Sequence, residues 1–166
     1  MPISSLFLIS FFVLLFDQAT KYAADIFLVS RETWPVASGI FHLTLVHNSG
    51  AAFGFLKGGS VFFIGISISC IVAICCLLKN RTLFYRFFAC DAHDRWIQCA
   101  LGLILGGALG NLVDRLRFSY VVDFLDFRIW PVFNLADSAI TVGGIIIFFK
   151  MLKKDKNSKH QIMIND

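Results

Sequence analysis

The chain has 166 residues, of which 57% are hydrophobic and 16% are charged, and its formal net charge is +4. Soluble domains average about 25% charged residues, so this composition excludes an ordinary soluble protein and indicates an integral membrane protein. The excess of positive charge is too small and too dispersed to suggest a nucleic-acid-binding protein.

Four apolar runs follow one another along the chain. They are Met1–Phe16, Ser60–Leu78, Ile97–Val113 and Ser138–Phe149. A helix needs about 20 residues to cross a bilayer, so the first run must continue through Asp17 to about Lys21, and the last must begin earlier or run through Lys150. We therefore predict an all-α membrane protein, a four-transmembrane-helix bundle with helices at about residues 3–22, 60–78, 97–114 and 135–152.

Basic residues are distributed unevenly over the connections. Nine Lys and Arg residues lie in the second connection and the C-terminal segment, and six lie in the other two connections. Because cytoplasmic segments carry the excess of Lys and Arg, both termini are predicted to be cytoplasmic. Residues 1–153 then form a single membrane domain, and residues 154–166 form a basic cytoplasmic tail. Met1–Ala24 lacks the positive start and the small-residue cleavage site of a signal peptide, so we expect an uncleaved first helix.

All five cysteines fall in the second and third predicted helices or in the connection between them. They are Cys70, Cys75, Cys76, Cys90 and Cys99. Because disulfides are rare in the cytosol, we expect these side chains to be free thiols.

The first external segment contains an alternating stretch. Phe41, Leu43 and Leu45 alternate with other residues, which predicts a half-buried strand over residues 41–46. The stretch continues into His47-Asn48-Ser49-Gly50, a turn signal, and then into the small residues Ala51-Ala52. Small residues around one Asn suit the close approach of a substrate backbone, and they suit a tight turn equally well.

The third apolar run combines small and polar residues. Gly102, Gly106 and Gly110 repeat at every fourth position, which predicts the close approach of another helix of the same chain. Asn111 and Arg115 are four residues apart and share a helical face. An ordinary polar helix terminus is the alternative explanation for this pair. We expect Asp114 to point away from both side chains.

Two carboxylates, Asp123 and Asp137, lie between the last two apolar runs. Asp123 follows Val121 and Val122, a pattern typical of an extended segment. Asn134 stands three residues before Asp137 and ahead of an apolar run, so Asn134 is a candidate N-cap to which Asp137 reaches back. This arrangement stabilises an aspartate in its ionised form, because the first helical turn lies at the positive end of the helix dipole.

A purely structural explanation is weak for a carboxylate at bilayer depth. Such a charge costs roughly 3 kcal/mol on insertion scales and usually faces the protein interior or a water-filled cavity. Two close carboxylates can share one proton, which leaves one as a general base and the other as a general acid. Asp123 and Asp137 therefore favour the chemistry of an aspartic hydrolase.

The predicted topology brings the unusual polar residues to one end of the bundle. On this map the first helix ends outside near Asp17, the third ends outside near Asn111, and the fourth begins outside near Asp137. A bundle that kept polar groups for solubility alone would spread them over both ends. We therefore predict a site near the outer membrane face. Asp126 and Arg128 are expected to face water or lipid headgroups, and Trp130 to lie in the aromatic belt of the interface.

Other functional classes fit the sequence less well. No HExxH spacing or His and Cys cluster indicates a metal site, no GxSxG motif indicates a serine nucleophile, and neither a metal nor a cofactor is expected. A small ion-coupled transporter would also keep carboxylates in a bundle, but it needs a continuous polar path, and the second helix offers only Ser67 and Ser69. A structural membrane subunit would explain only the glycines. A prepilin-type peptidase would require Gly-x-Gly-Asp, which does not occur.

Five motifs together resemble those of bacterial lipoprotein signal peptidase, also called signal peptidase II. In chain order they are Asp17-Gln18-Ala19-Thr20-Lys21, Asn48-Ser49-Gly50-Ala51-Ala52-Phe53, Gly110-Asn111-Leu112-Val113-Asp114-Arg115, Val121-Val122-Asp123-Phe124 and Phe133-Asn134-Leu135-Ala136-Asp137-Ser138. The resemblance extends over Phe7–Lys153, and none of the five motifs departs from the family pattern at the positions named below.

The resemblance implies an aspartic endopeptidase of the bacterial inner membrane. Its substrates would be prolipoproteins that are cut immediately before a lipobox cysteine carrying a diacylglyceryl group. By motif position Asp123 and Asp137 would form the catalytic dyad. The polar residues around them would be Asp17, Asn48, Asn111, Arg115 and Asn134. The family also implies a small extracytoplasmic β-cradle, which agrees with the alternation over residues 41–46, and it favours a monomer.

Overall fold

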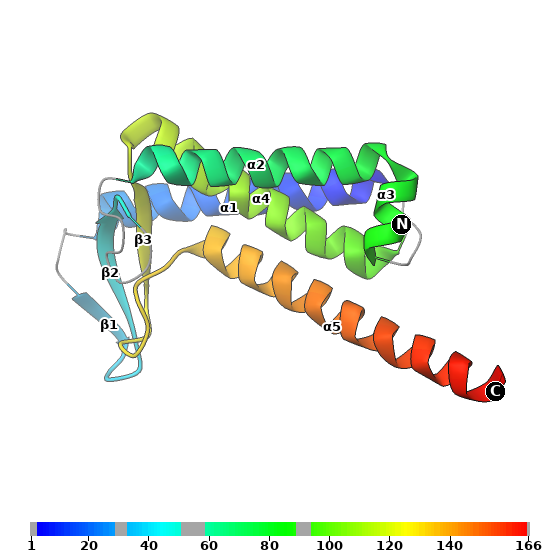
Figure 1. Cartoon of the computed structure of the whole chain (residues 1–166). Helices are drawn as coiled ribbons and strands as arrows, with labels where there is room; N and C mark the ends of the chain where they lie inside the picture. Colours follow the sequence, from blue (N-terminus) through cyan, green and yellow to red (C-terminus); the bar gives the residue numbers. More distant parts are fainter. Residues whose placement is uncertain (1–2, 29–32, 51–58, 89–93, 166) are drawn as a thin grey trace.

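The computed structural model describes residues 3–28, 33–50, 59–88 and 94–165, and it places side chains up to residue 152 (Figure 1). The helices are α1 (Ile3–Phe27), α2 (Ser60–Lys79), α3 (Arg81–Phe88), α4 (Arg95–Phe118) and α5 (Leu135–Asn165). The strands are β1 (Thr33–Ala37), β2 (Phe41–Asn48) and β3 (Val121–Asp126). Within these residues four helices, all but α3, are long and apolar enough to cross a membrane. The predicted four-helix membrane bundle is confirmed.

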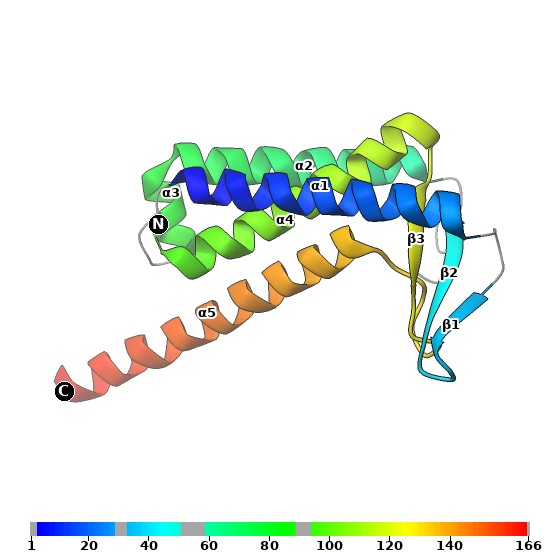
Figure 2. The same ribbon diagram turned by 180° about the vertical axis from the view of Figure 1, so that it is seen from behind.

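Helix α4 is the central helix and by far the most buried of the four spans. Glycines let it pack closely against its neighbours. A Cβ atom on Gly106 would lie 2.7 Å from the carbonyl oxygen of Ser10 in α1, and one on Gly107 would lie 2.5 Å from the carbonyl oxygen of Ala136 in α5. The predicted glycine face therefore does contact a helix of the same chain, and Gly107 forms a second close approach to α5. Figure 2, which views the molecule from behind, shows α1 running along α4.

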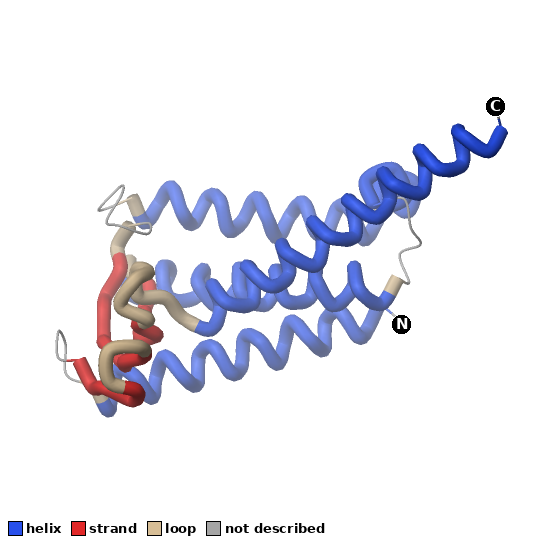
Figure 3. The backbone as a smooth tube through the Cα atoms, turned by 90° about the horizontal axis from the view of Figure 1, so that it is seen from below, coloured by secondary structure: helices blue, strands red, loops and turns tan. Residues whose placement is uncertain are grey.

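The strands form one antiparallel sheet at one end of the bundle, in the order β1-β2-β3 (Figures 1 and 3). The predicted strand at 41–46 is confirmed as β2, which extends to Asn48, and the extended segment around Asp123 is β3. Strand β1 was not predicted, because all five of its residues are exposed and show no alternation of buried and exposed positions. The sheet matters for the site because β2 and β3 pair with Asn48 opposite Val121 and Val46 opposite Asp123.

Two helical segments differ from the sequence prediction. The second connection contains α3, whose Phe84 and Phe88 pack with Ile97 of α4 in the core. The spacing of these two phenylalanines along one helical face could have indicated it. Helix α5 continues past the predicted end at residue 152 as far as Asn165, and its far end projects away from the bundle (Figure 1).

Both chain termini lie at the end of the bundle that is opposite the sheet (Figures 1 and 2). This arrangement agrees with an even number of membrane crossings. Four cysteines in the described part of the chain are free thiols, as expected, namely Cys70, Cys75, Cys76 and Cys99. Cys90 and the motif segment Ala51–Phe53 lie outside the described residues.

Candidate active site

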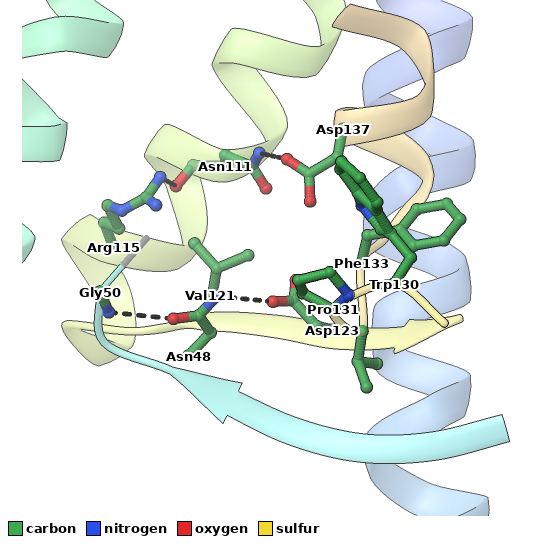
Figure 4. A pocket seen from close by; sticks show the side chains of 11 residues that line it. Asn48, Gly50, Asn111, Arg115, Val121, Asp123, Trp130, Pro131, Phe133 and Asp137 are labelled. Atoms are coloured by element: carbon green, nitrogen blue, oxygen red, sulfur yellow. Dashed lines mark hydrogen bonds between the residues drawn. The ribbon is translucent and has the colours of Figure 1, made fainter. Parts of the chain in front are cut away.

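A cavity of about 220 Å³ lies between the sheet and the adjoining ends of α4 and α5 (Figure 4). Five of the seven predicted site residues line it, namely Asn48, Asn111, Arg115, Asp123 and Asp137. The other two, Asp17 and Asn134, are fully buried and hydrogen-bond to residues of the site, as described below. The remaining walls come from Gly50, Val121 and the segment Trp130–Phe133. The structure therefore brings together residues that are far apart in the sequence.

Asp123 projects from β3 and is almost completely buried. Its Oδ2 accepts a hydrogen bond of 2.9 Å from Asn48 Nδ2, because β2 pairs with β3, and its Oδ1 accepts one of 2.7 Å from Asn134 Nδ2. Burial, and next the nearby charge of Asp137, raise the pKa of Asp123 from 3.8 to about 7, against the opposing effect of the two amide hydrogen bonds. Near neutral pH this carboxyl group therefore exchanges a proton readily.

Asp137 lies in the first turn of α5. Its backbone N–H donates to Asn134 Oδ1 at 2.9 Å, and its Oδ2 accepts from the Asn134 N–H at 3.4 Å. The predicted N-cap and its reciprocal contact are therefore confirmed. The other oxygen, Oδ1, accepts a hydrogen bond of 2.8 Å from Asn111 Nδ2. Asp137 therefore faces two hydrogen-bond donors, the Asn134 backbone N–H and the Asn111 amide, at the positive end of the α5 dipole.

Asn134 joins the two carboxylates. Among the described residues it alone hydrogen-bonds to both aspartates, through its Nδ2 to Asp123 and through its Oδ1 and N–H to Asp137. The same Nδ2 also lies 3.2 Å from Asn111 Oδ1. Local structure explains this position, since Asn134 must stand at the N-cap for α5 to begin at Leu135.

Asp17 lies in the interior of α1 and does not line the cavity. Its Oδ1 accepts a hydrogen bond of 2.9 Å from the Ala136 N–H, and its Oδ2 lies 2.8 Å from Lys21 Nζ. Asp17 thus binds one of the free N–H groups at the start of α5 and ties α1 to the helix that carries Asp137. Asp17 therefore supports the start of α5 from outside the cavity.

Three further residues belong to the site, and sequence reasoning missed them. Lys21 Nζ contacts Asp17, Asp114 and Asn111, while Gln18 Nε2 donates to Asp114 Oδ1 at 2.9 Å. The expectation that Asp114 points away from Asn111 was wrong. Its Oδ2 and Asn111 Oδ1 lie 3.0 and 2.9 Å from the same Lys21 Nζ, because residues three apart on α4 both face α1.

The spacing of the charges could have revealed this cluster. Asp17 and Lys21 are four residues apart on one helix, so a salt bridge between them is expected on geometry alone. The salt bridge was not predicted because Lys21 lies near the predicted helix end, where a lysine is commonly an interfacial residue. In the structure both side chains are buried.

Arg115 lines the cavity on the side of α4. Its guanidinium group stacks over the Phe63 ring of α2 at 5.0 Å, and its NH1 donates to the Asn111 carbonyl oxygen at 3.4 Å. In the described part of the chain it makes no ion pair with either aspartate. Its charge nevertheless acts on both Asp137 and Asp123 through space.

The end of β3 corrects one expectation. Asp126 was expected to face water or headgroups, but it is buried, and it accepts a hydrogen bond of 2.8 Å from the Thr44 hydroxyl. Although burial raises the pKa of Asp126, hydrogen bonds from the Arg128 N–H and from Thr44 hold it below its usual value. Trp130, which is expected in the interfacial belt, is 62% exposed and also lines the cavity.

Chemically, two carboxylates face the same cavity, each held by side-chain amides (Figure 4). One carboxyl has a pKa near 7, and the other is surrounded by hydrogen-bond donors. Such a pair meets the requirement for one general acid and one general base. The described residues contain no group of three or more His, Cys, Asp or Glu side chains that could hold a metal ion.

Comparison with known proteins gives a consistent result. Residues 9–153 match the family model described as signal peptidase (SPase) II. A lipoprotein signal peptidase of Moorella thermoacetica is 48% identical over 145 residues, which cover 87% of this chain and 91% of that protein. The corresponding protein of Pelotomaculum thermopropionicum is 43% identical and covers 94% of this chain and 97% of its own length.

Solved structures agree with the sequence relatives. A bacterial membrane enzyme determined at 2.3 Å superposes with a TM-score of 0.80 at 36% identity, over 95% of this chain and 93% of that one. A second bacterial membrane enzyme, determined at 1.9 Å, gives a TM-score of 0.76 at the same identity, over 92% of this chain and 96% of that one. This chain is thus a multi-pass membrane protein with the fold of those enzymes.

Proposed function

We propose a substrate and a mechanism for this chain, which belongs to the signal peptidase II family and is an aspartic peptidase. It removes the signal peptide from diacylglyceryl-modified prolipoproteins, cutting immediately before the lipidated lipobox cysteine. Its relatives are lipoprotein signal peptidases, which supports prolipoproteins as the substrate class. One observation supports the chemistry above all others, namely that Asp123 and Asp137 line one cavity and share Asn134 as a hydrogen-bonding partner.

In the proposed mechanism the two aspartates have different roles. Asp137 is the ionised base and Asp123 the protonated acid, because the pKa of Asp123 is raised to about 7 while Asp137 accepts hydrogen bonds from Asn111 and Asn134. A water between them loses a proton to Asp137 as its oxygen attacks the scissile carbonyl. Asp123 donates to the developing oxyanion. The proton on Asp137 then passes to the leaving amine as the C–N bond breaks.

Supporting residues hold this pair in place. Asn48 and Asn134 bind the two oxygens of Asp123, and Asn111 binds Asp137. Arg115 contributes a positive charge on the cavity wall that favours ionisation of one carboxylate. Since every one of these residues comes from a single chain, we propose that the monomer is active.

The location of the cavity suits a substrate that is anchored in lipid. We propose that the protein spans the bacterial inner membrane with both termini in the cytoplasm and the sheet on the extracytoplasmic side. The cavity lies at the sheet end of the bundle and the termini at the other (Figures 1 and 4). The diacylglyceryl chains can then stay in the bilayer while the scissile bond reaches the outer interface. Residues 154–166 are the proposed cytoplasmic tail.

Cleavage of a diacylglyceryl-modified prolipoprotein in liposomes tests this proposal. The native chain should cleave it, and Asp123→Asn and Asp137→Asn should each lose turnover by at least roughly 10³-fold, as expected when one member of an acid–base pair is removed. Asp126→Asn is the matched control, because Asp126 is also a buried aspartate of the sheet region but does not line the cavity. Full turnover in either of the first two variants would refute the dyad.

The lipid requirement needs its own measurement. Modified and unmodified forms of the same precursor should differ strongly in kcat/KM, since only the modified form holds the scissile bond at the membrane interface. Equal cleavage of both forms by the native chain would show that the lipid is not recognised.

A further inference from the structure

We propose that Lys21 is a positioning residue for the reaction proposed above: it fixes the orientation of the Asn111 amide so that its NH₂ group faces Asp137. The inference rests on that proposed function, and it concerns a residue outside the cavity. Lys21 lies on α1, and its side chain is only 3% exposed. It acts on Asp137 through Asn111.

All hydrogen-bonding capacity of the Lys21 ammonium group is used. Its Nζ lies 2.8 Å from Asp17 Oδ2, 3.0 Å from Asp114 Oδ2 and 2.9 Å from Asn111 Oδ1. A lysine ammonium has three donors and no acceptor, so each contact consumes one N–H. Two partners are carboxylates and neutralise the charge, but the third is neutral, and charge balance does not explain it.

The third contact determines which way the Asn111 amide points. An ammonium group cannot accept a hydrogen bond, so the atom of Asn111 that faces Lys21 must be its oxygen. That oxygen also accepts from Asn134 Nδ2 at 3.2 Å. The Asn111 Nδ2 must then point the other way, where it lies 2.8 Å from Asp137 Oδ1. If the Asn111 amide were flipped, its NH₂ group would face the donors of Lys21 and Asn134. Its oxygen would then face the carboxylate of Asp137.

This orientation has a consequence for proton placement. A donor held against Asp137 favours its ionised form, so the proton shared by the dyad remains on Asp123. The other charged groups that face this network are Asp17 on α1, Asp114 and Arg115 on α4, and Asp123 on β3. None of them donates a hydrogen bond to Asp137 among the described contacts. The sequence of contacts from Lys21 through Asn111 therefore contributes to the asymmetry of the pair, alongside the Asn134 backbone N–H that donates to the other oxygen of Asp137.

The competing explanation is that Lys21 only neutralises buried carboxylates. Lys21→Met removes all three donors and keeps a stem of similar length, but it leaves Asp17 and Asp114 without a cation, so it also threatens folding. The double variant Lys21→Met/Asp17→Asn restores the charge balance. It also retains an oxygen at position 17 that accepts from the Ala136 N–H. It does not restore the donor that faces Asn111 Oδ1.

Activity of these variants is measured on the lipid-modified precursor in liposomes, together with thermal unfolding. We expect the double variant to recover thermal stability relative to Lys21→Met while kcat stays reduced roughly 10- to 100-fold, the range for one hydrogen bond to a charged group. KM should change little, because no contact to the substrate is removed. The acid limb of the pH–kcat profile should change as well, since the donor that faces Asp137 is no longer held in place.

Recovery of kcat and of the native acid limb along with thermal stability would overturn the proposal, because neutralisation alone would then suffice. Lys150→Met is the matched control. It breaks an ion pair of 2.7 Å with Asp94, away from the cavity, and should leave kcat and the pH profile unchanged. A similar loss of kcat in that control would also count against a specific role for Lys21.

A measurement on the native chain keeps the proposal testable if both Lys21 variants fail to fold. The chain is labelled with ¹⁵N-asparagine, and the Asn111 side-chain signals are followed by NMR through the pH range of the activity profile. One Asn111 amide proton should shift with the titration of the dyad. A signal that does not respond would overturn the inference.

The two proposals fail in different ways. If the native chain does not cleave the precursor, or Asp137→Asn cleaves it normally, the proposed function is wrong. If both of those controls behave as expected but the double variant has native kcat and pH dependence, only the role of Lys21 is wrong.

Discussion

The side-chain amide nitrogen of Asn134 lies 2.7 Å from Asp123 Oδ1. The oxygen of the same amide accepts the backbone N–H of Asp137 and begins helix α5. One side chain thus caps the start of a helix and holds a carboxylate on a neighbouring strand. Helix formation and the geometry of the site therefore depend on each other at this residue.

Asn134 offers a way to separate the two roles. Asn134→Ser keeps an N-cap oxygen but removes the donor to Asp123, whereas Asn134→Ala removes both. We expect Asn134→Ala to be less stable than Asn134→Ser by about 1 kcal/mol, the usual value of an N-cap. Both should lose activity by roughly 10-fold or more. Thermal unfolding and precursor cleavage measure the two effects, and a fully active Asn134→Ser would show that the contact with Asp123 is dispensable.

The pKa of Asp123 predicts how activity depends on pH. Because the acid form of Asp123 is required in the proposed mechanism and its pKa is raised to about 7, kcat should fall as the pH rises through about 7. Asp126, whose pKa is lowered, should not contribute to this limb. The pH–kcat profiles of the native chain and of Asp126→Asn should therefore have the same basic limb. A native profile that is flat between pH 6 and 8, roughly one unit on each side of the Asp123 pKa, would contradict the assignment.

The same shift predicts how stability depends on pH. Since the pKa of Asp123 is 3.8 unperturbed and about 7 in the folded chain, the folded state binds more protons than the unfolded state between these values. The contribution of Asp123 to the free energy of unfolding must then decrease as the pH rises from about 4 to about 7. Asp123→Asn should reduce this slope. Thermal unfolding of both chains at several pH values tests the prediction, and equal slopes would contradict it.

Glycine packing gives a stability prediction with a built-in control. Gly106→Ala places a Cβ atom 2.7 Å from the Ser10 carbonyl oxygen and 2.7 Å from the Val13 Cβ, so we expect a loss of about 1–3 kcal/mol from overpacking. Gly65→Ala in α2 meets nothing within 4 Å. It should be neutral or slightly stabilising, because alanine favours helix. Thermal unfolding in detergent compares the two, and equal effects would show that α1 and α4 can separate without loss.

The end of α4 opposite the sheet carries a cap that can be tested separately from its ion pair. Asp94 accepts hydrogen bonds from the Trp96 and Ile97 N–H groups and contacts Lys150 at 2.7 Å. Asp94→Ser keeps the cap and loses the ion pair, which is partly exposed to solvent, so it should cost about 1 kcal/mol or less. Asp94→Ala should cost about 1 kcal/mol more. If the two variants unfold at the same temperature, the cap contributes nothing.

Several features followed from the sequence because they depend on neighbouring residues. The apolar runs, with the first and last extended by flanking residues, define the four spans, since length and composition alone decide whether a helix can cross a bilayer. The contacts between Asn134 and Asp137 were predictable for the same reason, because an N-cap involves residues three apart. The strand at 41–46 followed from its alternation, and so did the glycine face of α4 from its spacing. In each case the pattern and the structure it predicts lie within one short segment.

Only the tertiary structure decided which of these segments meet, and where. Asn48 contacts Asp123 across 75 residues of sequence, and Lys21 contacts Asn111 across 90. A period in the sequence tells which face of a helix is apolar, but it does not tell which partner covers a polar residue. A lysine near a helix end therefore resembles an interfacial residue until the close packing of α1 on α4 buries it against Asp17 and Asp114. The sequence determined the carboxylates and the membrane in which they lie, and helix packing decided which donors hold them.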